Sequence, residues 1–266
     1  MQTKYRSFSD IKTDKDNHVY IGHNNVEMIN SEIAFYGTNN YLIVEDGVCL
    51  INSSLTFRGD GAIVYISKNR HQVKLSVQVW TNTVLFLDED VHFTGPLRVA
   101  ISEEKNVLID KLCTFAVEST IRTSDAHLIY DCETLNRINP SKSVLIGERV
   151  WLGQGTTILK GTHIGSGSII GTCSVVSNKK IGVNECWGGN PAKLIREGVF
   201  WSGVCTHNFT QETAALYQTS RGSFKGITND KTIAAFIEFD NIDPSSQQLK
   251  CRFLANLRNK KNLFNE

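Results

Sequence analysis

The hydrophobic positions from Ile146 to Val176 recur every six residues. Each block of six residues, here called a six, opens with Ile or Leu. Its second position is Gly in four of the five blocks, and its fifth position is small or β-branched. A period of six fits neither an amphipathic helix nor an alternating strand. Hexapeptide repeats predict a parallel β-helix, in which three short strands form one triangular coil. The opening aliphatic residue and the fifth residue are then expected to point into the coil, and the Gly is expected at a bend with dihedral angles closed to other residues.

The chain before these sixes is also rich in short apolar segments. Between residues 31 and 108 they alternate in hydrophobicity and are separated by Gly, Asn and Asp, which is the pattern of strands and turns. A β-sandwich produces such a pattern too, but the segments lead without a linker into recognisable sixes. We therefore predict an all-β solenoid over residues 31–196, with irregular coils over 31–108 and hexapeptide coils over 109–196.

Two terminal segments and one internal segment fall outside this pattern. Residues 128–143 contain no sixes, and insertions in repeat proteins project from one face and often carry binding groups. Residues 1–30 are expected to be a lead-in that caps the solenoid. Residues 197–266 are expected to form an appendage that packs on the end of the solenoid or on a neighbouring subunit.

The appendage is predicted to contain a helix that opens near Asp243. Asp can cap a helix, and the Pro that follows it suits the first turn. Leu249, Phe253 and Leu257 would then form one apolar stripe. Residues 233–239 fit either a strand or a helix.

Composition excludes several functional classes. The net charge of +1 over 266 residues gives no electrostatic drive toward nucleic acid or a membrane surface. The first residues lack the apolar run of a signal peptide, and no stretch reaches the roughly 18–20 apolar residues of a transmembrane helix. The seven Cys are odd in number and include no CxxC pair, which argues against zinc and indicates reduced thiols in a cytoplasmic protein. No metal is expected.

Residues 128–143 are called the excursion below. Two residues beside it are candidates for chemistry, His127 before it and Trp151 after it. The unperturbed pKa of imidazole suits a general base near neutrality, and a residue at the edge of a projecting loop can meet a ligand. A His near a turn is also commonly a surface or packing residue, and the residues alone leave both interpretations open. The other histidines lack such a context and are interpreted as structural, with His163 expected at an exposed corner: His18, His23, His71, His92, His163 and His207.

The sequence is similar to the hexapeptide-repeat (left-handed β-helix) acyltransferases, especially the branch of galactoside and maltose acetyltransferases and of capsule or lipopolysaccharide O-acetyltransferases. The resemblance covers roughly residues 109–197, and residues 1–108 and the appendage lie outside it. The left-handed sense of the helix is taken from this family. The matching segments, besides the sixes, are Ser124–His127, Asn139–Pro140, Val144–Gly153 and Gly188–Arg196.

The resemblance implies direct acetyl transfer from acetyl-CoA. His127 matches the catalytic histidine, which removes the proton of an acceptor hydroxyl as that hydroxyl attacks the thioester. A backbone N–H is expected to stabilise the oxyanion. Trp151 matches a tryptophan that lines the acetyl and acceptor site. Asp125 is a candidate to orient the imidazole of His127, and the alternative is an exposed turn residue.

Six residues are predicted to bind acetyl-CoA: Gln154, Thr172, Ser177, Lys179, Lys193 and Arg196. By resemblance, Thr172 and Ser177 lie along the pantetheine arm and Lys179 contacts a CoA phosphate. Lys193 and Arg196 match basic positions that reach the nucleotide phosphates, or else belong to a solvated charged end.

Tyr130 and Arg137, on the excursion, are candidates to contact a sugar or an acidic substrate. The resemblance also implies a homotrimer with active sites between subunits, in which His127 faces the CoA groove across the interface. We therefore predict a cytoplasmic O-acetyltransferase that modifies a sugar hydroxyl of a bacterial surface polysaccharide, capsule or lipopolysaccharide, with a carbohydrate acceptor and no nucleic acid partner.

Three other functions remain open from the sequence. One is N-acetylation of a nucleotide-linked amino sugar. Another is a metal-dependent β-helix resembling the carbonic anhydrases, which needs several histidines at one metal, whereas this region offers His127 and His163. The third is a non-catalytic β-helix scaffold, for which His127→Ala would leave function unchanged.

Overall fold

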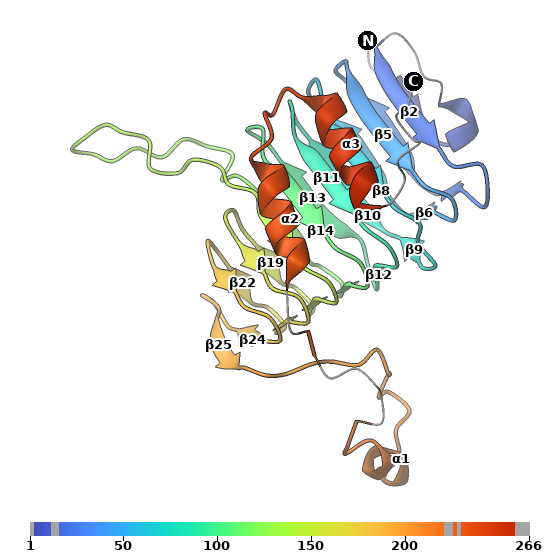
Figure 1. The fold of residues 1–266 in the computed structure, drawn as a ribbon, viewed down its shortest axis with the longest axis vertical. Coiled ribbons are helices and arrows are strands. Elements are labelled where there is room, and N and C mark those ends of the chain that lie inside the picture. Colours follow the sequence, from blue (N-terminus) through green and yellow to red (C-terminus); the bar gives the residue numbers. More distant parts are fainter. Residues whose placement is uncertain (1–2, 12–15, 221–225, 228–229, 259–266) are drawn as a thin grey trace.

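The computed structural model describes residues 3–11, 16–220, 226–227 and 230–258. Over these residues the chain forms the left-handed parallel β-helix that the repeat and the resemblance predict, with coils stacked along three faces (Figure 1). Neighbouring strands pair in parallel, except at the two ends of the solenoid, where β1 pairs with β4 and β24 with β25 in antiparallel fashion. The parallel pairing of successive coils over residues 31–108 excludes the β-sandwich.

Each face is built from every third strand. Face A has the strands β1 (Thr3–Tyr5), β4 (Glu32–Phe35), β7 (Ser54–Phe57), β10 (Leu75–Val79), β13 (Leu97–Ile101), β16 (Thr120–Arg122), β19 (Thr157–Ile158) and β22 (Val175–Val176). Face B has β2 (Asn17–Ile21), β5 (Asn40–Val44), β8 (Ile63–Ile66), β11 (Val84–Leu87), β14 (Asn106–Ile109), β17 (Val144–Ile146), β20 (His163–Ile164) and β23 (Lys180–Ile181). Face C has β3 (Glu27–Ile29), β6 (Cys49–Ile51) and β9 (Gln72–Val73), followed by β12 (His92–Phe93), β15 (Thr114–Phe115), β18 (Trp151–Leu152), β21 (Ile169–Ile170), β24 (Cys186–Gly188) and β25 (Lys193–Arg196).

The interior of the sixes is as predicted. The opening residues from Ile146 to Val176 are fully buried, and so are the fifth residues, which are Val150, Thr156, Thr162, Ser168 and Ser174. Each coil therefore packs one large aliphatic and one small side chain at every turn of the prism. Stacked coils can then approach closely without leaving voids.

The reason for Gly at the second position differs from the prediction. The left-handed backbone lies at the fourth position instead, for example at Gly155 (φ 67°), Gly161 (φ 75°) and Cys173 (φ 55°). A Cβ at Gly147 would lie 2.4 Å from Ser166 Oγ of the next coil. The close approach of successive coils thus requires glycine at Gly147, Gly153 and Gly165, whereas a Cβ at Gly171 would make only ordinary van der Waals contacts.

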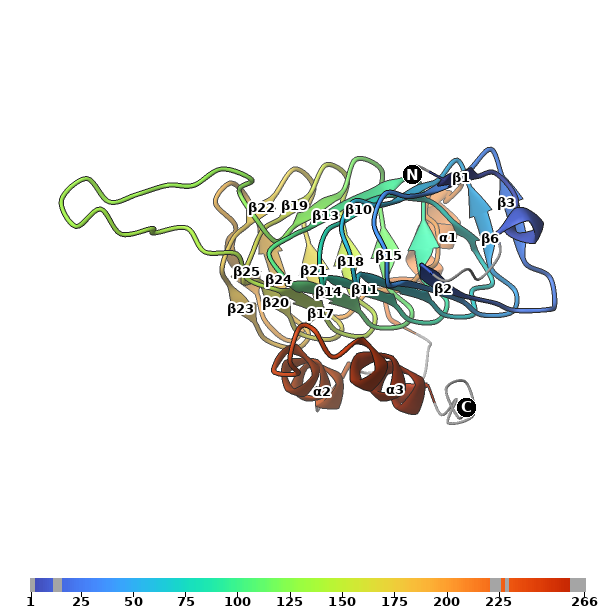
Figure 2. The same cartoon turned by 90° about the horizontal axis from the view of Figure 1, so that it is seen from above.

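Two helices of the appendage pack along the side of the solenoid. The short helix α1 (Gln211–Leu216) has no buried residue, whereas α2 (Lys231–Asp240) and α3 (Gln247–Leu257) lie against face B (Figure 2). There they form a second hydrophobic core with outward-facing aromatic and aliphatic side chains of the sheet, among them Tyr65 and Phe86. Residues 233–239 are helical, and no helix in the described ranges is long and apolar enough to cross a membrane.

A helix after Asp243 is confirmed, but it begins at Gln247 with Ser246, not Asp243, at its N-cap. Of the predicted stripe, only Phe253 packs against the core. Leu249 and Leu257 are 56% and 38% exposed, and the buried face includes Lys250, Cys251 and Leu254. The hydrophobicity pattern could not predict this face, because Lys250 counts as a polar residue. In the structure its aliphatic stem packs in the interface between the helix and the sheet.

The excursion projects far from the solenoid as an extended arm between β16 and β17 (Figures 1 and 2). Its two strands are joined by an antiparallel bridge between Tyr130 and Arg137 and by a hydrogen bond from Ile138 N to Ile129 O of 2.9 Å. Asp131 closes its tip by accepting hydrogen bonds from the backbone and hydroxyl of Thr134. The arm is thus a hairpin anchored at the corner where face A meets face B.

Candidate active site

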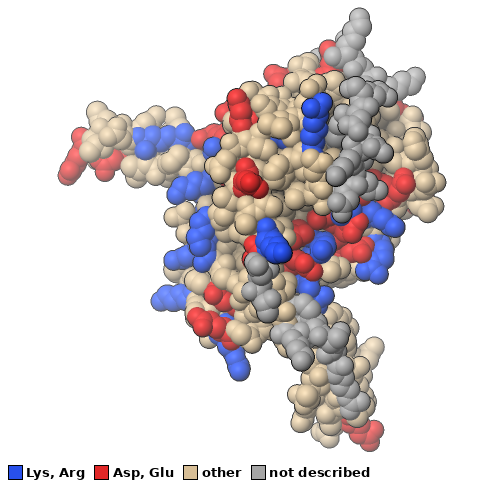
Figure 3. Space-filling view, viewed as in Figure 1, with Lys and Arg blue, Asp and Glu red and all other residues tan. Residues whose placement is uncertain are grey.

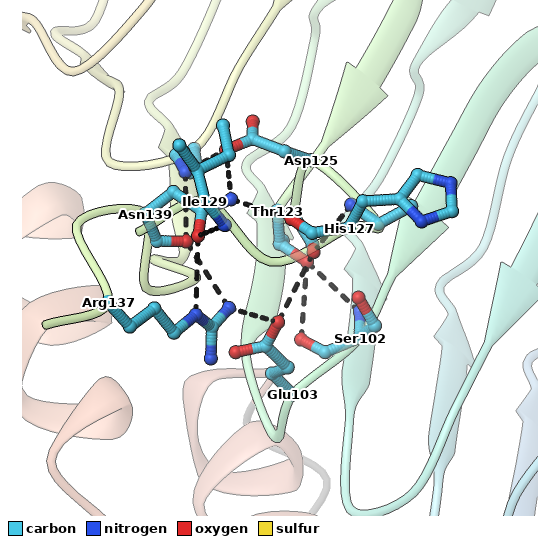
Figure 4. A network of polar contacts seen from close by, with 11 residues as sticks. Ser102, Glu103, Thr123, Asp125, His127, Ile129, Arg137 and Asn139 are labelled. Atoms are coloured by element: carbon cyan, nitrogen blue, oxygen red, sulfur yellow. Dashed lines mark hydrogen bonds and ion pairs between the residues drawn. The ribbon is translucent and has the colours of Figure 1, made fainter. Parts of the chain in front are cut away.

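His127 lies at the base of the arm, at the corner between face A and face B. Its side chain is exposed. The imidazole points away from the polar network that holds the arm (Figure 4). The ring is thus presented outward from a loop held by hydrogen bonds, where a ligand or a second chain can reach it.

The backbone of His127 is fixed by the buried carboxamide of Asn139. Its Nδ2 donates to His127 O (2.8 Å) and to Asp125 Oδ2 (3.0 Å). Its Oδ1 accepts from Ile129 N (2.9 Å) and from Arg137 Nε (3.3 Å) (Figure 4). One side chain therefore ties together the outgoing and returning strands of the arm on both sides of His127.

Asp125 belongs to the same anchor. Its carboxylate accepts hydrogen bonds from Lys160 and Asn139. The hydrogen bond from the Lys160 ammonium is the main reason why the pKa of Asp125 is below its usual range. The imidazole of His127 points away from this carboxylate (Figure 4), so the structure brings Asp125 to Lys160 and not to the ring.

The two substrate candidates on the arm have different surroundings. Arg137 Nη2 lies 2.7 Å from Glu103 Oε1, and this hydrogen bond is the first cause that lowers the pKa of Glu103 to about 2. Arg137 thereby holds the arm to the turn after β13. The Tyr130 side chain is 53% exposed on the arm, where it is accessible to a ligand or a second chain.

Trp151 lies on face C, which is opposite the corner that carries His127. It is the first residue of β18, its side chain is 40% exposed, and its ring centroid is 6.0 Å from that of Trp201 at an interplanar angle of 49°. The two rings border a cavity of about 580 Å³ that His71 and His92 also line. Within one chain the two principal candidates, His127 and Trp151, are therefore not brought together.

The cavity residues were missed because their proximity depends on coil register. His92 pairs with Thr114, and Thr114 pairs with Trp151, so the three occupy one row across face C. Trp201 reaches the row because the segment after the solenoid folds back over it. The residues next to His71 and His92 in the sequence indicate no site. Their neighbours in the cavity lie one or two coils away and are distant in the sequence.

The six predicted CoA contacts are exposed and fall into three groups. Ser177 and Lys179 lie at the A–B corner, on the same edge as His127. Gln154 and Thr172 lie at the corner between face C and face A, in successive coils joined by a hydrogen bond from Cys173 N to Gln154 O of 2.7 Å. Lys193 and Arg196 lie on β25, at the end of face C.

Further basic residues at the A–B corner had not been singled out from the sequence. Lys142 Nζ donates to Asn178 Oδ1 (3.1 Å), beside Lys179. The pKa of Lys180 is lowered by burial and by the charge of Lys142. Figure 3 shows Lys and Arg side chains gathered along the edge below the arm. Such crowded ammonium groups favour an anionic ligand.

Comparisons with known proteins agree with this architecture. Residues 143–178 match the family described as "Bacterial transferase hexapeptide (six repeats)". The chain is 30% identical over 186 residues to a polysialic acid O-acetyltransferase of Neisseria meningitidis, and this match covers 70% of the chain and 86% of the relative.

Two solved structures are similar over most of their length. The polySia-specific acetyltransferase NeuO has a TM-score of 0.66 and 29% sequence identity, with coverage of 76% of this chain and 93% of that one. The polysialic acid O-acetyltransferase OatWY has a TM-score of 0.54 and 22% identity, with coverage of 76% and 95%, and its likeness concerns the fold.

Proposed function

The chain belongs to the hexapeptide-repeat acyltransferases, in the branch that includes capsule O-acetyltransferases, and from this premise we propose that it transfers an acetyl group from acetyl-CoA to a hydroxyl of a bacterial surface polysaccharide. The observation that carries the proposal is the outward-facing His127 on its anchored loop, beside a basic edge. The relatives' names make polysialic acid the first acceptor to test. The reaction would take place in the cytoplasm, where acetyl-CoA is available.

In the proposed mechanism His127 is the general base. Its imidazole takes the proton of the acceptor hydroxyl as the oxygen attacks the thioester carbonyl and the new C–O bond forms. When the C–S bond breaks, the imidazolium returns the proton to the departing sulfur. The products are an acetyl ester and free CoA, and the imidazole is neutral again. The carbonyl oxygen needs a hydrogen-bond donor while it carries charge.

The A–B corner is suited to the phosphates of the cosubstrate. Lys142, Lys179 and Lys180 lie there around Asn178, and the charge of Lys142 already lowers the pKa of Lys180. A bound phosphate would relieve this repulsion between ammonium groups. We propose that these lysines, with Ser177, hold the CoA phosphates on the edge that carries His127 of the same chain, in place of the arrangement across the interface that the resemblance implies.

We further propose that each active site is shared by two subunits of a homotrimer. A sugar at Trp151, on face C, is separated from His127 of the same chain by the body of the prism. A neighbouring chain that presents its A–B corner to face C would bring the two side chains together. The exposed apolar residues of the arm, Leu128, Ile129, Tyr130, Leu135 and Ile138, are suited to such an interface.

The proposal is tested with purified protein, acetyl-CoA and a panel of capsule and lipopolysaccharide glycans that includes polysialic acid, with release of free thiol as the readout. His127→Ala should lower kcat by about 10²–10⁴-fold, which is typical for loss of a general base. His23→Ala, a change at an exposed His far from the arm, should leave kcat unchanged. Full turnover by His127→Ala would show that the mechanism is wrong, and turnover only of an amino sugar would favour N-acetylation.

A further inference from the structure

The cavity beside Trp151 is assembled from distant parts of the chain. His71 and His92 come from two successive coils, Trp151 from a third, and Trp201 and Ser202 from the segment that follows the solenoid. This segment forms one wall, and face C forms the other. A volume of about 580 Å³ falls in the range of small-molecule sites and exceeds what one sugar ring needs.

The aromatic part of the cavity is fixed before any ligand binds. Trp201 Nε1 donates to Arg149 O (2.6 Å), and the Arg149 guanidinium lies over the Trp201 ring, 5.6 Å from its centroid. These contacts hold Trp201 at its angle of 49° to Trp151. Two inclined indole faces can stack on the C–H face of a pyranose ring. Because Trp201 is already held in place, its side chain loses little conformational entropy when a ligand binds.

The polar part of the cavity is suited to hydroxyl and carboxylate groups. The rings of His71 and His92 meet edge to face with centroids 5.1 Å apart. Burial, together with the charges of His71 and Lys74, lowers the pKa of His92. His92 is therefore neutral near pH 7, with one nitrogen that donates and one that accepts hydrogen bonds.

The charges around the cavity favour an anion. Asp90 is the acidic side chain of the lining, and its carboxylate pairs with Arg70 at 2.9 Å. Arg149 adds a guanidinium to the lining. Because Arg70 neutralises Asp90, Arg149 is the unbalanced charge among these three side chains, and it attracts a carboxylate on the ligand.

We propose that this cavity is the acceptor subsite, which binds an acidic sugar unit of the glycan chain between Trp151 and Trp201, with His71 and His92 as hydrogen-bonding partners. The proposal rests on the proposed function, because it assigns the acceptor to the Trp151 side of the shared active site. It also separates the two substrates: the glycan lies on face C of one chain, and the CoA phosphates lie on the A–B corner of the next.

Binding is measured by calorimetry on the full-length His127→Ala protein with a short oligomer of polysialic acid, so that turnover does not interfere. Added to this background, Trp201→Ala should weaken binding about tenfold or more, as expected for loss of a buried aromatic contact. His71→Ala, a change at an exposed side chain, should weaken binding several-fold. Trp80→Ala is the matched control, since Trp80 is 36% exposed and outside the cavity lining.

Steady-state kinetics in the otherwise unmodified enzyme separates this inference from the proposed function. Trp201→Ala and His71→Ala should raise KM for the glycan and leave KM for acetyl-CoA within about twofold. Unchanged glycan binding and unchanged glycan KM in both variants would overturn the acceptor subsite while the transfer reaction stands. A raised KM for acetyl-CoA alone would also overturn it, because the rings would then bind the cosubstrate. Absence of any turnover by the unmodified enzyme would overturn the proposed function itself.

Discussion

Asn139 holds the backbone of His127, the proposed base, through its buried carboxamide. Its carboxamide contacts His127 O, Asp125, Ile129 N and Arg137, so its removal frees both strands at the base of the arm. We expect Asn139→Ala to lower kcat by about 10–100-fold, because small displacements of a catalytic group are costly. KM for acetyl-CoA should remain unchanged, since the lysines at the corner are not disturbed.

The matched control for this prediction is Asn136→Ala, a change of the same residue type at an exposed position near the tip of the arm. It should retain full kcat. Asn139→Asp keeps the acceptor but loses both donated hydrogen bonds and faces Asp125, so it should not rescue activity. The measurement is the kcat and KM of each variant; equal kcat for Asn139→Ala and Asn136→Ala would refute the positioning role.

The candidate residues that could be predicted from the sequence are those beside the break in the hexapeptide repeat. His127 and Trp151 stand on either side of the excursion and were found in this way. His71, His92 and Trp201 were not, because their meeting depends on the register of stacked coils and on a segment that folds back. The partner of Asp125 was also not predictable, since Lys160 approaches it from the next coil of the A–B corner.

At the scale of elements, the helices that cover face B change the environment of its outward residues. His163, expected at an exposed corner, is instead half-buried in β20, where it pairs in register with Lys180. Burial is the main cause, and Lys180 the second, of a pKa near 4. The helices were predictable only in part, because the buried Lys250 on α3 obscures the apolar face that docks on the sheet.

This environment predicts a pH dependence of stability. The pKa of His163 is lowered from 6.5 to about 4 in the folded chain, so the folded state takes up a proton less readily than the unfolded state. Its stabilising contribution is present above pH 6.5 and is lost as pH falls toward 4. His163→Gln should therefore lose less stability than the unmodified chain between pH 7 and pH 4.5.

The measurement is the midpoint of thermal unfolding of each protein at both pH values, with circular dichroism as the readout. His23→Gln, at an exposed position, should show the same loss as the unmodified chain. If His163→Gln and the unmodified chain lost the same stability between pH 7 and pH 4.5, protonation of His163 would not be the cause of the loss.

At the scale of the whole molecule, the two proposed halves of the active site lie apart in one chain. The A–B corner has His127, the proposed base, and a basic edge, and face C has the aromatic cavity, with the prism between them. Hexapeptide periodicity could predict the prism, since inward positions follow from the sequence. It could not predict which surfaces meet in an assembly, because that depends on shapes contributed by the arm and by the segment after β25.

Mixing two inactive variants tests whether these halves come from different chains. Trp151→Ala keeps His127, and His127→Ala keeps Trp151. If each site takes its His from one subunit and its Trp from the next, random co-assembly of equal amounts leaves about a quarter of the interfaces with both residues. Activity should therefore return to roughly a quarter of the unmodified level when the two variants are co-expressed. If both residues came from one chain, every site would carry one defect, and the mixture would stay as inactive as either variant alone.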